Sequence, residues 1–126
     1  MIMDWQDYMT SLSAQIRELR LGQPDVMKNF SGMAQASLKT NALDSKTKEL
    51  IALAIGVATR CDDCIAFHTK AAIDQGASRA EVMETLGLAI YMGAGPSVMY
   101  ASHAVEAFDQ LAAAKAAKAA TAPAQD

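Results

Sequence analysis

The sequence predicts a single all-α domain of six helices. Apolar residues recur at helical spacing through most of the 126 residues, and no segment alternates polar and apolar residues as a half-buried strand does. Residues typical of helix caps and stops separate these periodic segments. A chain of 126 residues is a normal size for one domain, and we assign the domain to residues 1–112.

Three of the expected helices precede the two cysteines. Asp4 is placed to cap the first helix and Gly22 to stop it. Pro24 suits the first turn of the second, and Asp44 or Ser45 can cap the third. The third helix is apolar on nearly every side, so we expect it to be central and buried over most of its surface. The expected ranges are 5–20, 24–38 and 45–60.

The other three expected helices follow the first cysteine. Gly76 can end the fourth helix with a positive φ, and Ser78 with Glu81 forms a capping box for the fifth. The sequence GAGP then breaks the chain, and Pro96 suits the first turn of the sixth helix. Residues 113–126 are rich in alanine with little to bury, so we expect a frayed or disordered tail. The expected ranges are 64–75, 79–92 and 96–111.

Composition and charge narrow the possible functions. The 11 basic and 14 acidic residues form no basic cluster, so we expect no nucleic-acid partner. No run of about eighteen apolar residues predicts a membrane span, and the N-terminus lacks an export signal, so we expect a reducing cytoplasm. Because 52% of the residues are hydrophobic, with several sides of the helices apolar, we also expect a homo-oligomer.

The segment TRCDDCIAFHTK holds both cysteines of the chain. Cys61 is expected at a turn and Cys64 in the first turn of the fourth helix, where the positive end of the helix dipole stabilises a thiolate. The one-turn spacing lets the two sulfurs approach to disulfide distance. In a reducing compartment such a pair is more often catalytic or metal-binding than structural. Asp62 and Asp63 lie between the sulfurs, and we expect them to cap the helix.

Two further side chains could handle protons near these sulfurs. His68 lies four residues after Cys64 and therefore on the same helical face, where it could relay a proton. Glu49 either complements the dipole of the third helix or, if it faces inward, acts as a general base. A straight helix would separate Glu49 from Cys61 by about 18 Å. Contact therefore requires the fourth helix to fold back or a neighbouring subunit to contribute.

The segment from residue 48 to 101 resembles the carboxymuconolactone decarboxylase superfamily, specifically its AhpD-like alkylhydroperoxidase branch. That branch is marked by a glutamate twelve residues before a Cys-x-x-Cys and a histidine four residues after the second cysteine. Here the pattern falls on Glu49, Cys61, Cys64 and His68. The resemblance implies an all-helical fold that assembles as homotrimers or homohexamers. It also implies a Cys61/Cys64 dithiol that cycles with its disulfide, without a bound cofactor, and a proton relay of Glu49 and His68.

The resemblance further implies the reaction partners. AhpD-like proteins reduce hydroperoxides or recharge a peroxiredoxin, and a dithiol of the lipoyl type is the expected electron donor. We expect Cys64 to attack the peroxide, since His68 lies one turn away. The best-known AhpD pattern has a second histidine just before the second cysteine, where this chain has Asp63. A carboxylate does not replace an imidazole donor, so that relay is incomplete here.

Other interpretations of the same residues stay open. Thiolate, imidazole and carboxylate suit zinc, so Cys61, Cys64 and His68, with Glu49, could bind a metal ion. A lactone decarboxylase acting on small organic acids is a second alternative, although such enzymes generally lack the cysteine pair. A purely structural helical oligomer with unreactive thiols is a third. We interpret His103, far along the sixth helix, as a core or interface residue.

Overall fold

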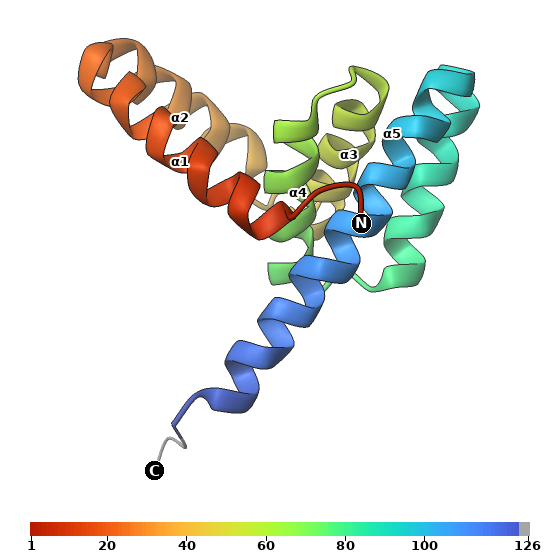
Figure 1. The fold of residues 1–126 in the computed structure, drawn as a ribbon. Helices are drawn as coiled ribbons and strands as arrows, with labels where there is room; N and C mark the ends of the chain where they lie inside the picture. The colour runs from red at the N-terminus through yellow and green to blue at the C-terminus, as the bar shows by residue number, and fades with distance from the viewer. Residues whose placement is uncertain (124–126) are drawn as a thin grey trace.

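The computed structural model describes residues 1–123, and within them the chain forms five helices and no strand. The all-α prediction is therefore confirmed (Figure 1). No helix in this part of the chain is both long and apolar enough to cross a membrane. The helices are α1 (Trp5–Gly22), α2 (Pro24–Leu38), α3 (Ser45–Ala58), α4 (Asp62–Asp74) and α5 (Arg79–Thr121).

The helix ends follow the local signals in the sequence. The side chains of Asp4 and Asp44 each accept the N–H of the residue three positions on, which caps α1 and α3. Ser78 and Glu81 form the predicted capping box at the start of α5. Gly76 has a φ of +87° just after α4, a conformation that glycine adopts without steric cost. These predicted caps and stops are confirmed.

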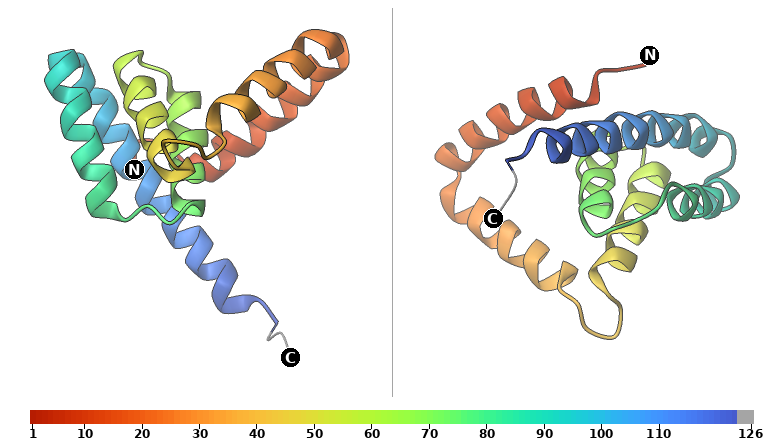
Figure 2. Two further views of the ribbon diagram at one scale, coloured as in Figure 1. Left: turned by 180° about the vertical axis from the view of Figure 1, so that it is seen from behind. Right: turned by 90° about the horizontal axis from the view of Figure 1, so that it is seen from below.

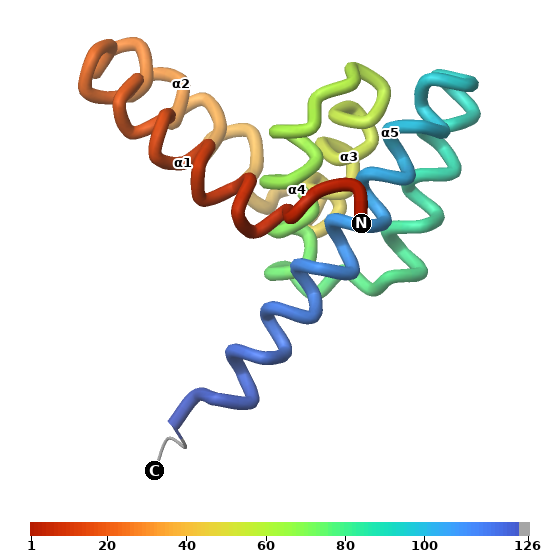
Figure 3. The backbone as a smooth tube through the Cα atoms, viewed as in Figure 1, coloured from red at the N-terminus to blue at the C-terminus, as the bar shows by residue number. Residues whose placement is uncertain are grey.

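Within residues 1–123 the structure has one helix fewer than predicted. The fifth and sixth expected helices form the single element α5, which changes direction at Ala94, where φ is 55° and ψ is −142°. Figure 3 shows the chain reversing there, so that the two parts of α5 lie side by side. The GAGP sequence thus breaks the helical backbone as expected, but the break is a single residue and leaves no intervening loop.

The C-terminal segment is more ordered than predicted. Helix α5 continues to Thr121, so the expectation that fraying begins at residue 113 is wrong. Each added residue of an already formed helix gains a hydrogen bond without a new nucleation cost, and alanine favours this extension. Nζ of Lys115 also lies 3.4 Å from Oδ1 of Asp74 in α4, which forms an ion pair between the two helices. Residues 124–126, for which a disordered tail was also expected, lie outside the described residues.

Helices α3, α4 and α5 pack against one another, whereas α1 and α2 form a hairpin that projects from them (Figures 1 and 2). The core contains Trp5, at the start of α1, with 0% of its surface exposed. Most residues of α3 are buried or half-buried, as predicted, but Ile51 and Ile55 are 45% and 57% exposed in the single chain. The other fully buried large side chains are Leu53, Ile65, Val57, Val82 and Thr69.

Candidate functional site

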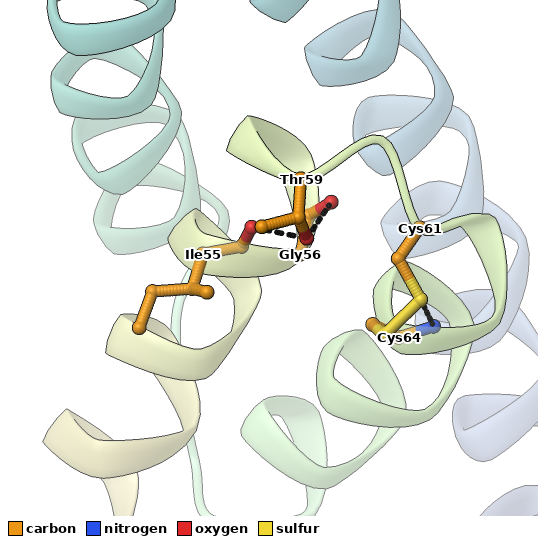
Figure 4. Close-up of a disulfide and its surroundings, with 5 residues drawn as sticks. All are labelled: Ile55, Gly56, Thr59, Cys61 and Cys64. Atoms are coloured by element: carbon orange, nitrogen blue, oxygen red, sulfur yellow. Dashed lines mark hydrogen bonds between the residues drawn. A yellow bond between two sulfur atoms is a disulfide. The ribbon is translucent and has the colours of Figure 1, made fainter.

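Cys61 and Cys64 form a disulfide at the start of α4, with an S–S distance of 2.06 Å and a Cα–Cα distance of 5.2 Å (Figure 4). Cys61 is the N-cap residue of α4, and its sulfur accepts the backbone N–H of Cys64 at 3.1 Å. The expectation that Asp62 and Asp63 cap this helix is therefore wrong, and both lie in its first turn. Both cysteines are half-buried. The predicted placement of the two cysteines around the first turn of this helix is confirmed. After reduction, the same N–H would favour a thiolate at Cys61.

The end of α3 holds this turn in place. Cys61 donates its backbone N–H to the carbonyl oxygen of Gly56 at 2.9 Å, and Arg60 adopts a φ of 59° between the two helices. A Cβ atom on Gly56 would lie 3.0 Å from the Cβ of Cys64, closer than most real contacts of this kind. Glycine therefore permits the close approach of α3 to the disulfide, which Figure 4 shows.

Glu49 and His68 form the second part of the site. Oε2 of Glu49 lies 2.7 Å from Nδ1 of His68, and Glu49 is only 7% exposed. Helix α4 folds back along α3, which is the first of the two arrangements that the sequence allowed. The Glu49 carboxylate therefore faces inward. Because it occupies Nδ1, it leaves Nε2 of His68 as the ring nitrogen for proton exchange.

A second histidine and carboxylate pair lies at the start of α4, and no local pattern in the sequence predicts it. Oδ1 of Asp62 lies 2.8 Å from Nδ1 of His103, which comes from α5. The rings of Trp5 and Tyr100 lie 6.3 and 5.0 Å from the His103 ring, centroid to centroid. The pair joins residues 41 positions apart, so neither helix periodicity nor a local motif could predict it.

The N-terminal segment is bound to α5 beside this second pair. Glu106 accepts the backbone N–H groups of Ile2 and Met3 and, at 3.1 Å, the indole Nε1–H of Trp5. The hydrogen bond from Ile2, followed by those from Met3 and Trp5, holds the pKa of Glu106 below its usual value. These bonds fix the buried Trp5 ring next to His103.

The four residues considered as metal ligands are engaged with one another in two pairs, the Cys61–Cys64 disulfide and the Glu49–His68 hydrogen bond. Within residues 1–123, no group of three or more His, Cys, Asp and Glu side chains is arranged to hold a metal ion.

A groove of about 1360 Å³ lies elsewhere, between α1, α4 and the C-terminal part of α5. Its lining includes Arg17, Phe67 and Lys118, but neither cysteine, nor Glu49, nor His68. The groove is therefore separate from the disulfide, and we do not include it in the candidate site.

An all-helical domain with a Cys-x-x-Cys disulfide at a helix start and a buried Glu–His pair defines a class of small helical proteins with a dithiol site. Residues 24–107 match the model of the carboxymuconolactone decarboxylase family, and the chain belongs to this family. The resemblance inferred from the sequence is thus confirmed at the level of the family.

Relatives of known sequence cover nearly the whole chain. An uncharacterized protein of Cupriavidus necator is 40% identical over 111 residues, which are 88% of this chain and 98% of that protein. Uncharacterized protein 4 in the cox locus of Paracoccus denitrificans is 31% identical over 103 residues, 82% of this chain and 93% of that protein.

Two solved structures share the fold. The apo form of lpg0406, a carboxymuconolactone decarboxylase family protein from Legionella pneumophila, has a TM-score of 0.84 and 45% identity over 86% of this chain and 96% of its own. TM1620 of Thermotoga maritima, a family member for which an involvement in the antioxidative response has been suggested, has a TM-score of 0.79 and 27% identity, over 87% and 94% of the two chains.

Proposed function

We propose that the protein is a thiol–disulfide oxidoreductase of the AhpD-like type that reduces hydroperoxides with the Cys61/Cys64 dithiol. The observation that carries this proposal is the disulfide at the start of α4, one turn from a histidine held by a buried glutamate. The helix start favours a thiolate, and the Glu49–His68 pair supplies a group that can accept and return a proton. The antioxidative role suggested for the Thermotoga maritima protein supports the same assignment.

The proposed reaction consumes one hydroperoxide for each dithiol. The Cys64 thiolate attacks the terminal peroxide oxygen, the O–O bond breaks, and the departing alkoxide takes a proton from His68 to become an alcohol. The Cys64 sulfur is now a sulfenic acid. The Cys61 thiol loses its proton, its thiolate attacks this sulfur, the S–O bond breaks, and the departing hydroxide takes up that proton to leave as water. Two thiols are oxidised to the disulfide and the peroxide is reduced to an alcohol and water.

An external dithiol completes the cycle. A thiolate of the donor attacks one sulfur of the Cys61–Cys64 disulfide, and the second donor thiol releases the mixed disulfide, which leaves the donor oxidised. We propose a donor of the lipoyl type, in a reducing cytoplasm. The same exchange, run toward a protein disulfide, would recharge a peroxiredoxin.

We also propose that the protein acts as a homo-oligomer, a trimer or a hexamer. Several large apolar side chains of α3 and α5 are exposed in the single chain, which is costly in water unless another surface covers them. Light scattering after size exclusion would measure the mass directly. A mass of 13.4 kDa would contradict this part of the proposal. The exposed side chains in question are Ile51, Ile55, Leu88, Tyr91 and Met92.

A thiol count tests the proposed function. The reduced protein is mixed with one equivalent of an alkyl hydroperoxide, and its free thiols are counted before and after. We expect the loss of both thiols, formation of one equivalent of alcohol, and a peptide linked through Cys61 and Cys64 by mass spectrometry. Unchanged thiols, or stoichiometric zinc in the purified protein, would overturn the proposal. Cys61→Ser is the matched variant, since it should stop at the Cys64 sulfenic acid.

A further inference from the structure

Both histidines of the chain are bonded through Nδ1 to a carboxylate, but only the Glu49–His68 pair has a place in the proposed reaction. The other pair begins at Asp62, the residue next to Cys61. We propose that His103 is a positioning residue that controls the charge beside Cys61: when protonated, it neutralises Asp62 and so favours the Cys61 thiolate. This inference rests on the proposed function, in which the Cys61 thiolate closes the disulfide.

Asp62 directly follows Cys61 in the chain, so we expect its charge to influence the Cys61 sulfur. Asp62 lies in the first turn of α4, and its side chain is 28% exposed, so water and salt screen it incompletely. A carboxylate close to a thiol disfavours the thiolate, because two negative charges would then be neighbours. Without a positively charged partner, the Asp62 carboxylate would disfavour a thiolate at Cys61 and so counteract the helix dipole, which favours that thiolate.

A protonated His103 can offset the negative charge of Asp62, and this effect depends on pH. Histidine changes its charge between about pH 5 and 8. The Asp62–His103 pair therefore has no net charge when His103 is protonated and one negative charge when it is neutral. A protonated pair should leave more Cys61 as thiolate than a neutral imidazole would. Because His103 acts through Asp62, its effect should depend on the presence of that carboxylate.

The other ionisable groups around His103 do not share this arrangement. On α5, Tyr100 packs against its ring, and Glu106 is engaged with the N-terminal segment, whose ammonium group also acts on Glu106. Helix α1 contributes Trp5, which does not titrate. On α3, the buried Glu49 is bonded to His68.

Asp63 of α4 also lies between the two cysteines, but it makes no ion pair among residues 1–123. It therefore provides a matched control for Asp62.

The test measures one thiol and uses no peroxide. In a Cys64→Ser background, Cys61 is the single cysteine, and its rate of alkylation by iodoacetamide between pH 5 and 10 reports its thiolate fraction. At pH 6.5 we expect His103→Gln to react about threefold more slowly than the parent, which corresponds to a shift of about half a pH unit. At pH 9 the two rates should converge, because a histidine side chain carries its positive charge only at lower pH.

Double variants separate this role from a merely structural tie between α4 and α5. Asp62→Asn should raise the rate at pH 6.5 about threefold, and His103→Gln should then change it by less than about 1.5-fold. In the Asp63→Asn background, His103→Gln should still lower the alkylation rate at pH 6.5 about threefold. Equal rates for the parent and His103→Gln at pH 6.5, or an undiminished loss in the Asp62→Asn background, would overturn the proposal.

Two further measurements keep the test decisive if His103→Gln proves unstable. His103→Lys keeps a positive charge at all pH values below 9, so it should match the parental rate at pH 6.5 and should not converge with His103→Gln toward pH 8. Trp5, the only tryptophan, lies 6.3 Å from the His103 ring, so its fluorescence should respond to the charge of His103. A Trp5 signal that is flat from pH 5 to 8 would contradict the proposal.

The outcome is independent of the hydroperoxide assay. If thiols survive peroxide but the alkylation rates follow the pattern above, the proposed function fails and the role of His103 stands. If thiols are lost to peroxide but His103→Gln has no effect on alkylation, the reverse holds.

Discussion

Glu49 and His68 lie nineteen positions apart in the sequence, yet Oε2 of the first is 2.7 Å from Nδ1 of the second. The contact exists because α4 turns back along α3 immediately after the cysteines. It places a buried carboxylate and an imidazole on the two helices that flank the disulfide turn. The hydrogen bond from His68 to Glu49, the most buried polar residue of α3, thus helps to fix the orientation of α4 relative to α3.

Glu49→Gln should slow the oxidation of the dithiol by hydroperoxide by about tenfold or more while preserving the fold. Glutamine retains the shape and the hydrogen bond but lacks the charge that favours a protonated His68, and general acid–base catalysis typically contributes at least this much. The rate is measured by stopped-flow loss of thiol. Glu84→Gln, on an exposed part of α5, removes the same charge elsewhere and should react at the parental rate.

His68→Ala should slow the same oxidation and also lower stability. The variant leaves the Glu49 carboxylate, 7% exposed, without its imidazole partner, which costs about 1–3 kcal/mol. Thermal unfolding followed by circular dichroism measures this loss. If Glu49→Gln and His68→Ala both oxidise at the parental rate, the relay assignment is wrong.

Gly56→Ala should destabilise the protein by about 1–3 kcal/mol and disturb the cysteine turn. The new methyl group would lie 3.0 Å from the Cβ of Cys64, an atom next to the backbone that cannot rotate away. Gly87→Ala is the matched control, because nothing lies within 4 Å of a Cβ there and the change should stabilise α5 by about 0.5–1 kcal/mol. Equal changes in stability for the two substitutions would show that α3 does not pack closely against the disulfide.

Local signals in the sequence were sufficient for most of the fold. The caps at Asp4, Asp44 and Ser78 and the stop at Gly76 act over three or four residues, so they could be recognised without knowing the packing. The extent of the C-terminal helix could not be recognised in this way, because it depends on α5 being already anchored by its earlier turns.

In the candidate site, too, one contact could be predicted from the sequence and another could not. The family pattern links Glu49 to His68 at a fixed spacing, so their proximity could be expected from the sequence. The contact of Asp62 with His103 depends on how the second part of α5 packs on α4 after the chain reverses at Ala94. No spacing rule predicts that geometry, so the sequence alone indicates only a core or interface position for His103.

Ala94→Gly should stabilise the protein by about 1 kcal/mol. Ala94 has a φ of 55° with a ψ of −142°, a combination that is costly for any residue with a Cβ and accessible to glycine. The gain exceeds the extra conformational entropy that glycine adds to the unfolded chain. Chemical denaturation measures the difference, and Ala113→Gly, at an exposed helical site, should instead lower stability by about 0.5–1 kcal/mol. A lower stability of Ala94→Gly would contradict the expectation.

Acid should release the N-terminal segment through Glu106. The bonds from Ile2, Met3 and Trp5 lower the pKa of Glu106 from its ordinary 4.5, so its stabilising contribution is complete above pH 4.5 and is lost as the pH falls through the lowered value. Trp5, fully buried at neutral pH, would then become exposed. We expect its emission to shift to longer wavelength below pH 4.5, ahead of any loss of helical circular dichroism.

Glu106→Gln separates this carboxylate from the other acidic groups. A neutral amide oxygen accepts the same N–H groups more weakly and does not titrate, so the variant should show part of the Trp5 shift at pH 7 and no added step below pH 4.5. Glu84→Gln should behave as the parent does. If the parent and Glu106→Gln share one acid transition of Trp5 emission, a different carboxylate controls the N-terminal segment. A transition present only in the parent would assign it to Glu106, because the two proteins differ in that single titrating group.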